Sequence, residues 1–165
     1  MLREALAGLP TRPAVYLSVI AVVLGLGYHF VTTYQSCRGH AALREALSVA
    51  VTSSAARAIP LRLAQITDFP WDRAEILVNY KPGGASTDCP FQWDWSRTAR
   101  EEIIAKDLLT VIVFVRDGKL VNYLEIRSDQ VRFADIENPY SPETAVFRAA
   151  RSQVSPEQYL LIPAP

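Results

Sequence analysis

The hydrophobic pattern begins with a long apolar run near the N-terminus. Residues 13–37, PAVYLSVIAVVLGLGYHFVTTYQSC, contain no Asp, Glu, Lys or Arg, and residues 14–31 are an apolar stretch of 18 positions. A helix needs about 20 residues to cross the hydrocarbon of a bilayer. Tyrosines near both ends of the run suit the aromatic belts of the membrane interfaces: Tyr16, Tyr28 and Tyr34. The pattern predicts a transmembrane helix over residues 13–36.

Three other interpretations of the apolar run remain open. A cleaved signal peptide needs small residues before the cut, and TTYQSC has no A-x-A-like site. A lipoprotein signal places small residues just before a cysteine, whereas Tyr-Gln-Ser precedes Cys37. A buried core helix is disfavoured by the length of the run. We therefore expect an uncleaved signal anchor, with cleavage or lipidation at Cys37 as alternatives.

The charges around the run give only a weak positive-inside bias. Arg3 and Arg12 precede it, and Arg38 and Arg44 follow it. Short N-terminal segments of this kind usually act as signal anchors. We therefore expect residues 1–12 in the cytoplasm and the remainder of the chain on the other side of the membrane.

Residues 38–57, RGHAALREALSVAVTSSAAR, contain no proline. Apolar residues recur there at helical spacing: Leu43, Leu47, and Ala50 or Val51. This pattern predicts a juxtamembrane amphipathic helix over residues 37–59, which either continues the membrane helix or bends away near Gly39. Pro60 ends it.

After Pro60 the periodicity changes to that of strands. LRLAQI and AEILVNY alternate apolar and other residues. In LLTVIVFVRDGKLVNYLEIR, two β-rich runs flank Asp117-Gly118, which suits a two-residue type I′ turn. Residues 108–115 are apolar on both faces, so we expect this strand at the centre of the sheet.

The rest of the chain is predicted from shorter signals. KPGGASTDCP is a loop by composition, and SRTAREEIIAKD is a short helix capped by Ser96 or Thr98. SDQVRFADIENPYSPE is predicted as a loop, residues 144–151 as a strand or short helix, and EQYLLIP as a last extended segment. Together these elements predict an α+β domain over residues 60–165, in which a mostly antiparallel sheet packs against one or two helices.

The two cysteines, Cys37 and Cys89, are candidates for a disulfide in an oxidising compartment. Closing a loop of about 50 residues would contribute on the order of 4 kcal/mol. The alternative is two unrelated thiols, because Cys37 follows the membrane segment directly. Their spacing excludes C-x-x-C redox chemistry, and a zinc site would need more ligands.

Charge and composition narrow the function classes. Lys and Arg number 17 and Asp and Glu number 17, so no basic field draws nucleic acid. The two histidines, His29 and His40, have neither a nearby nucleophile nor metal-ligand spacing. Gly83-Gly84 lacks the spacing of a phosphate-binding loop. We expect no catalytic centre, metal or cofactor.

The motif F-x-W-D occurs twice, at residues 69–72 and 91–94. Aromatic residues two apart on a strand point to one face and usually fill a core, so we assign the first copy and its strand to the core or a structural motif: Phe69, Trp71, Asp72 and Tyr80. The Asp of the motif can cap a turn by accepting backbone N–H bonds, or accept from an indole N–H. The second copy follows a polar loop, and we regard it as a core segment or a partner-binding surface: Phe91, Trp93, Asp94 and Trp95. Asp72 and Asp94 each follow a Trp, whose apolar face can raise a carboxyl pKa, so they are also the candidates for a small hydrolase.

Three segments, ITDFPWDRAEILVNYKPG, LTVIVFVRDGKLVNYLEI and PYSPETAVFRAA, resemble a group of small bacterial envelope proteins. In that group a lipoprotein signal or membrane anchor precedes a domain with an F-x-W-D…Y strand and a hydrophobic hairpin. The resemblance covers about residues 60 to 150 and implies a non-catalytic domain of the cell envelope. This chain departs from the pattern because it lacks a lipobox.

Taken together, these features predict a single-pass protein of the bacterial inner membrane with its C-terminal domain in the periplasm. We expect the domain to bind a protein partner, as an inhibitor or immunity protein against a toxin or hydrolase that reaches the periplasm. The alternative is a structural or assembly subunit of an envelope complex. A small hydrolase is the third possibility.

Overall fold

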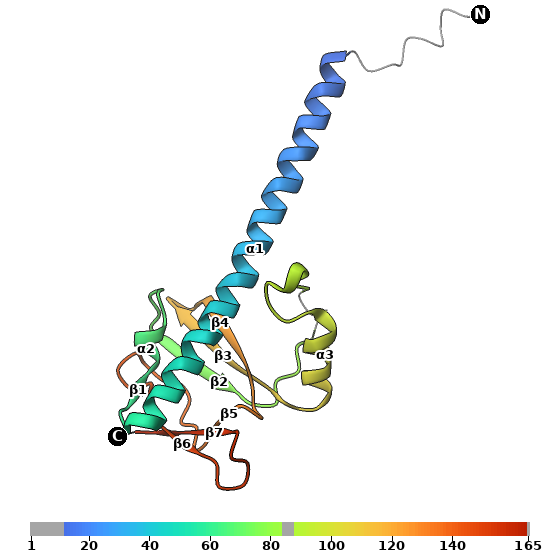
Figure 1. The fold of residues 1–165 in the computed structure, drawn as a ribbon. Coiled ribbons are helices and arrows are strands. Elements are labelled where there is room, and N and C mark those ends of the chain that lie inside the picture. The colour runs from blue at the N-terminus through green and yellow to red at the C-terminus, as the bar shows by residue number, and fades with distance from the viewer. Residues whose placement is uncertain (1–11, 84–87, 165) are drawn as a thin grey trace, which may run out of the picture. The chain divides into compact units, whose positions relative to one another are not determined.

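A computed structural model describes residues 12–83 and 88–164 of the chain (Figure 1). The chain divides into two compact units, Met1–Ser36 and Cys37–Pro165. Most of the predicted cytoplasmic segment 1–12, and Gly84 of the predicted loop, lie outside the described residues.

The first helix, α1 (Arg12–Arg57), is continuous through the predicted membrane segment. Over Val15–Arg57 it is long and apolar enough to cross a membrane by length and composition, and its most apolar window has no buried residue. These properties agree with a single membrane-spanning helix, while the compartment on either side remains a prediction.

The last turns of α1 belong to the core of the second unit. Leu43, Leu47 and Val51 follow one another at four-residue steps on one helix face, and each is buried. Ser54 then donates a hydrogen bond to the carbonyl of Ile59 at 2.6 Å, where the chain turns out of the helix. The juxtamembrane helix predicted over residues 37–59 therefore forms the last part of α1, and its buried leucines and valine also pack in the core of the domain.

The first sheet is antiparallel and has the order β2-β3-β4. It comprises β2 (Arg73–Leu77), β3 (Leu109–Arg116) and β4 (Lys119–Arg127). Asp117 and Gly118 join β3 to β4 with φ values of 51° and 72°, and two positive angles are what a type I′ turn requires. The central place of β3 confirms the prediction from its two apolar faces.

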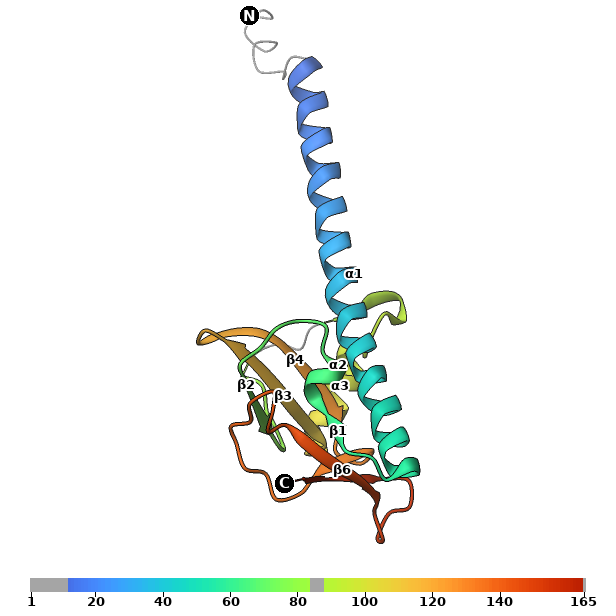
Figure 2. The same cartoon turned by 90° about the vertical axis from the view of Figure 1, so that its left-hand side faces the viewer.

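The second sheet has the order β1-β6-β7-β5. It comprises β1 (Leu61–Arg62), β6 (Val146–Arg151), β7 (Tyr159–Pro163) and β5 (Val131–Phe133), of which only β5 and β7 pair in parallel. Three short helices complete the fold: α2 (Leu63–Ile66), η1 (Pro90–Gln92) and α3 (Arg97–Ala105). The predicted α+β class is confirmed, and Figure 2 shows β2, β3 and β4 together with β6 beneath them.

Each sheet contributes to the core one phenylalanine that contacts two further aromatic rings. Phe114 of β3 contacts the rings of Phe69 and Trp71 at centroid distances of 5.3 and 5.4 Å. On the other sheet, Phe147 of β6 contacts the rings of Phe133 and Tyr140, both at 5.3 Å. All six rings belong to one buried cluster together with Leu47 and Val51 of α1, either within it or packed against it. The helix and both sheets therefore share one core.

Two local predictions were wrong. LRLAQI was expected to be a strand, but pairing with β6 stops at Arg62, and a helical turn follows from Leu63. Residues 131–133, expected within a loop, form β5 because β7 offers them a partner edge. Both errors arise from pairing between distant segments, which overrides the local pattern.

Both outer edges of the first sheet are covered in part. Beside β2, Ala74 exchanges two backbone hydrogen bonds with Tyr140, at 2.8 and 2.9 Å. Next to it the side-chain amide of Asn138 takes the place of a strand residue: its Oδ1 accepts from the Ile76 amide, and its Nδ2 donates to the Ile76 carbonyl, both at 2.8 Å. Beside β4, Asn122 Oδ1 accepts from the Tyr123 amide at 2.8 Å, and the carbonyl of Glu125 accepts from Arg44. Such covering protects a sheet from pairing with another chain.

We expect Asn138→Ala to lower the free energy of unfolding by about 1–2 kcal/mol, because the amide and carbonyl of buried Ile76 lose their partners. Asn138→Asp keeps an acceptor and loses the donor, so its effect should be intermediate. Denaturant unfolding of the full chain in detergent measures both. The control is Gln153→Ala, at an exposed amide between β6 and β7. Equal stability of Asn138→Ala and this control would show that Asn138 does not support the edge.

Candidate functional site

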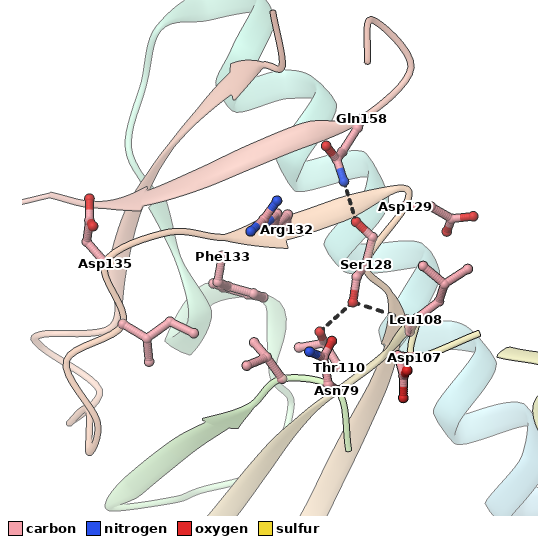
Figure 3. Close-up of a pocket in the computed structure, with 12 residues that line it drawn as sticks. Asn79, Asp107, Leu108, Thr110, Ser128, Asp129, Arg132, Phe133, Asp135 and Gln158 are labelled. Atoms are coloured by element: carbon pink, nitrogen blue, oxygen red, sulfur yellow. Dashed lines mark hydrogen bonds between the residues drawn. The ribbon is translucent and has the colours of Figure 1, made fainter. Parts of the chain in front are cut away.

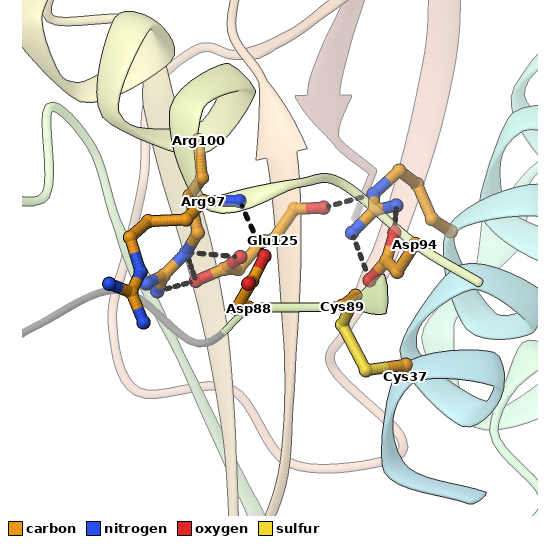
Figure 4. The surroundings of a disulfide bond; sticks show 8 residues. Cys37, Asp88, Cys89, Asp94, Arg97, Arg100 and Glu125 are labelled. Carbon is orange, nitrogen blue, oxygen red and sulfur yellow. Dashed lines mark hydrogen bonds and ion pairs between the residues drawn. A yellow bond between two sulfur atoms is a disulfide. The ribbon is translucent and has the colours of Figure 1, made fainter. Parts of the chain in front are cut away.

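A disulfide joins Cys37, at the start of the second unit, to Cys89 (Figure 4). The two Cα atoms lie 5.8 Å apart, and both side chains are buried. The bond closes a loop with a sequence separation of 52 residues, which the chain-entropy model values at about 4 kcal/mol. The disulfide thus links the segment before α3 covalently to α1.

Arg44 makes a second connection between the helix and this segment. Its guanidinium donates to both carboxylate oxygens of Asp94, at 2.5 and 3.3 Å, and to the carbonyl of Glu125 at 2.9 Å. The same group lies 3.7 Å from the ring centroid of Trp95. One side chain of α1 therefore holds the chain after η1 and the edge of β4.

The predicted partner-binding residues fall into two groups. Asp94 and Trp95 are held by Arg44, so they serve the domain's own structure. Phe91 is 75% exposed, and its ring lies 5.2 Å from that of Trp93. Phe91 and Gln92 have φ values of 56° and 58° and belong to η1. We refer to residues 90–93 as the aromatic loop.

The first F-x-W-D copy has a different role. Trp71 is buried, and its indole N–H donates to Thr67 Oγ1 at 2.9 Å. Asp72 Oδ2 accepts from the amide of Asp117 at 2.8 Å and so supports the hairpin turn. The side chains of the motif stand on an irregular segment before β2 and not on a strand.

Tyr80 corrects the core assignment, since 37% of its side chain is exposed. The strand ends at Leu77, and Asn79 turns the chain with a φ of 52°. The Tyr80 amide donates to the carbonyl of Leu109 at 2.8 Å, but its ring faces a groove. The alternation of AEILVNY could not show where the pairing stops.

The two candidate catalytic carboxylates are held in separate places. Asp72 lies at the Asp117 end of β3, while Asp94 is bound through Arg44 to Glu125, which pairs with Val111. Positions 111 and 117 are six residues apart, or about 20 Å along a strand. A glycosidase-type pair requires about 5–9.5 Å. Their separation does not fit a shared acid–base site.

The concave site of greatest interest is a groove of 390 Å³ on the face of the first sheet that carries Val111 and Val113. We call it the sheet groove, and its lining is mostly apolar: Tyr80, Pro82, Val111, Val113, Leu120 and Tyr123, with Arg100 and Glu125. Leu120 is 63% exposed at its margin. Part of the same sheet face is covered by Ile103 of α3, so the groove begins where that cover ends.

A buried ion pair forms part of the groove lining. Arg100 of α3 donates from Nε to both carboxylate oxygens of Glu125, at 2.9 and 2.8 Å, and from Nη2 to Oε1 (Figure 4). The hydrogen bond to Glu125 raises the pKa of Arg100 above its usual value. Because both side chains are almost wholly buried, the pair is a fixed charged element in an apolar surface.

His40 packs against the groove from α1, with its ring 4.4 Å from that of Tyr123. Burial lowers the pKa of His40 below its ordinary value, and Asp94 and Glu125 oppose this shift only in part. Among residues 12–83 and 88–164, no three His, Cys, Asp or Glu side chains are grouped to hold a metal ion.

A second pocket, of 470 Å³, lies between the ends of the two sheets (Figure 3). Gln158 donates to the carbonyl of Ser128 at 2.5 Å, and Ser128 Oγ lies 2.8 Å from Thr110 Oγ1. Three lining residues have φ values near 50°: Asn79, Asp107 and Asp135. Asn and Asp adopt this conformation readily at strand ends. The pocket is therefore lined by turns and by polar groups that already form hydrogen bonds with each other. These groups do not form an organised set of ligands.

Sequence reasoning missed the residues that organise this region: Arg44, Arg100, Leu120, Tyr123 and Glu125. One signal was present, because Glu125 stands in an otherwise apolar part of its strand, YLEI, and a buried acid needs a partner. Nothing in the local pattern identified Arg100 as that partner.

We expect Glu125→Gln to lower the free energy of unfolding by about 3 kcal/mol, because it leaves the Arg100 charge buried without its counter-charge. The double variant Arg100→Leu/Glu125→Leu should be more stable than Glu125→Leu alone, since it removes both charges. Chemical unfolding of the parent protein, Arg100→Leu, Glu125→Leu and the double variant in detergent gives the coupling. Simple additivity of the two single losses would contradict a coupled pair.

The pKa shift of His40 predicts a pH dependence. The unfolded state binds the proton with a pKa of about 6.5, and the folded state binds it only at lower pH. Stability from neutral His40 is therefore complete above this value and falls as the pH drops below it. His40→Phe keeps a ring beside Tyr123 and should flatten the unfolding free energy of the full chain in this window. An unchanged slope would exclude His40 as its source.

Comparison of the chain with protein-family models, with curated proteins and with solved structures finds no match.

Proposed function

We propose that this is a single-pass membrane protein whose Cys37–Pro165 unit binds a protein partner through the sheet groove. The observation that carries the proposal is an apolar groove of 390 Å³ with Leu120 exposed at its edge and a fixed Arg100–Glu125 pair in its lining. Apolar surface around a few placed polar groups is typical of recognition sites.

The fold favours a partner that inserts side chains into the groove. Asn138 and Tyr140 cover the β2 edge, while Asn122 and Arg44 cover part of the β4 edge. Addition of a partner strand at these positions would first have to break those bonds. A partner that places an apolar side chain beside Leu120 and Tyr123 disturbs none of them.

The contacts that the two candidate carboxylates already make favour a binding function over hydrolysis. Asp72 supports a hairpin turn, and Asp94 neutralises Arg44. Each is already engaged in a contact that the fold uses. A hydrolase remains the weaker third possibility.

The disulfide supports an oxidising compartment for this unit, because such bonds persist in secreted and periplasmic domains. We place the N-terminus in the cytoplasm and the binding unit in the periplasm of a bacterium, anchored by residues 13–36. A tethered binding domain at that place suits an inhibitor or immunity protein against a toxin or hydrolase that enters the periplasm. A subunit of an envelope complex is the alternative.

The test is a photo-crosslinking amino acid placed at Leu120 in the full chain within cells. We expect a discrete adduct with one protein, and we expect Tyr123→Asp to abolish it by placing a charge in the apolar groove. The matched control position is Val154, which is 92% exposed between β6 and β7. Equal adducts at both positions, or none at Leu120, would contradict groove binding.

Two further measurements separate the finer alternatives. Replacing residues 13–36 with an unrelated membrane helix should preserve the function of an inhibitor, while loss of function would favour an assembly subunit. A reporter active only outside the cytosol, fused to the C-terminus, should be active. If it were silent, the proposed orientation would be wrong.

A further inference from the structure

The aromatic loop, residues 90–93, suggests a second contact besides the sheet groove. It presents a large exposed ring, Phe91, in contact with the ring of Trp93. We infer that this loop inserts into the headgroup layer of the bilayer that α1 crosses, with Phe91 and Trp93 as the inserting side chains. The inference rests on the proposed membrane anchor.

The first argument is the length of the tether. Cys37 is the sixth residue after Val31, where the apolar stretch ends, and six residues of helix rise about 9 Å. The headgroup layer on each side of the hydrocarbon is about 5–8 Å thick. Cys37 therefore lies close to the outer boundary of the headgroups when the apolar stretch fills the hydrocarbon.

The disulfide brings the loop to the same depth. The Cα atom of Cys89 is 5.8 Å from that of Cys37, and Phe91 follows two residues later, within about 7 Å. A loop on a free tether would not be restricted in this way. Here the covalent bond limits Phe91 to the neighbourhood of the bilayer surface.

The second argument is the conformation of the loop. Phe91 has a φ of 56°, an uncommon value for a bulky residue, which costs on the order of 1–3 kcal/mol. The disulfide at Cys89 and the Arg44–Asp94 pair hold the chain on either side of it. The domain thus maintains a strained turn that exposes an aromatic ring.

The third argument is the charge around the loop. Residues 90–93, Pro-Phe-Gln-Trp, carry no charge, and the next acid, Asp94, is neutralised by Arg44. Two exposed arginines flank the attachment points: Arg38 follows Cys37, and Arg97 donates its amide to Asp88, the residue before Cys89. Aromatic rings between apolar and polar layers, with cations facing lipid phosphates, are typical of interfacial anchors.

The test uses the full chain reconstituted in vesicles of phosphatidylethanolamine and phosphatidylglycerol whose acyl chains are brominated near the headgroup. Bromine quenches nearby tryptophan, and the chain has 3 Trp residues. We expect quenching in the parent protein and its loss in Trp93→Phe. The matched control, Trp71→Phe, changes a buried indole and should retain the quenched component.

A second pair of variants addresses a failure of Trp93→Phe to fold. Phe91→Asp should reduce the quenching of Trp93, while Val154→Asp, at an exposed site on another loop, should not. Unchanged quenching in both Trp93→Phe and Phe91→Asp would overturn the inference. If Phe91→Asp abolished the Leu120 cross-link and left quenching intact, the loop would belong to the protein interface, and bilayer insertion would be wrong.

Flotation of the vesicles after an alkaline wash separates this inference from the membrane anchor. A chain that floats without quenching of Trp93 keeps its anchor and contradicts only the insertion of the loop. A chain that is washed off the vesicles contradicts the anchor itself, and loop insertion falls with it.

Discussion

The arrangement of the Cys37–Pro165 unit depends on the contacts of one guanidinium, that of Arg44. It binds the carboxylate of Asp94, the main-chain oxygen of Glu125 and the face of Trp95. These three partners come from two segments that share no strand pairing with each other. Asp94 has only 8% of its side chain exposed, so it would be a poorly solvated charge without Arg44. The disulfide attaches the chain to α1 at Cys89. Arg44 attaches it to the same helix a second time at Asp94, five residues later.

The side chains and backbone that cover parts of both sheet edges influence what kind of surface the domain can offer. A small sheet with open edges invites pairing with any extended chain, which gives affinity but little selectivity. Here Asn138 occupies the hydrogen-bonding groups of Ile76 as a strand would, and Asn122 shields the amide of Tyr123. What remains for a partner is the sheet face, where apolar side chains and the Arg100–Glu125 pair define shape and charge. Selective binding follows more readily from that surface than from backbone pairing.

The sequence predicted what depends on local chemistry and missed what depends on distant pairing. The long apolar helix, the Asp117-Gly118 hairpin and the Ser96 cap are each set by a few neighbouring residues, and all are present. β5 exists only because β7 lies beside it, and Tyr80 is exposed because the strand ends before it. The two F-x-W-D copies show the same limit. The first letter of the motif is Phe69, packed against the core, in one copy and the exposed Phe91 in the other, according to what packs against each.

The groove is connected to the part of α1 that belongs to the second unit through a small set of described side chains. Glu125 binds Arg100 with its side chain and Arg44 with its main chain, while Tyr123 contacts His40. Both helix residues lie within two turns of Cys37, where the apolar segment has just ended. A surface held in this way is ordered before a partner arrives, so binding loses little conformational entropy. In the proposed function, a partner in this groove would be bound close along the chain to the membrane segment, as a tethered binding protein requires.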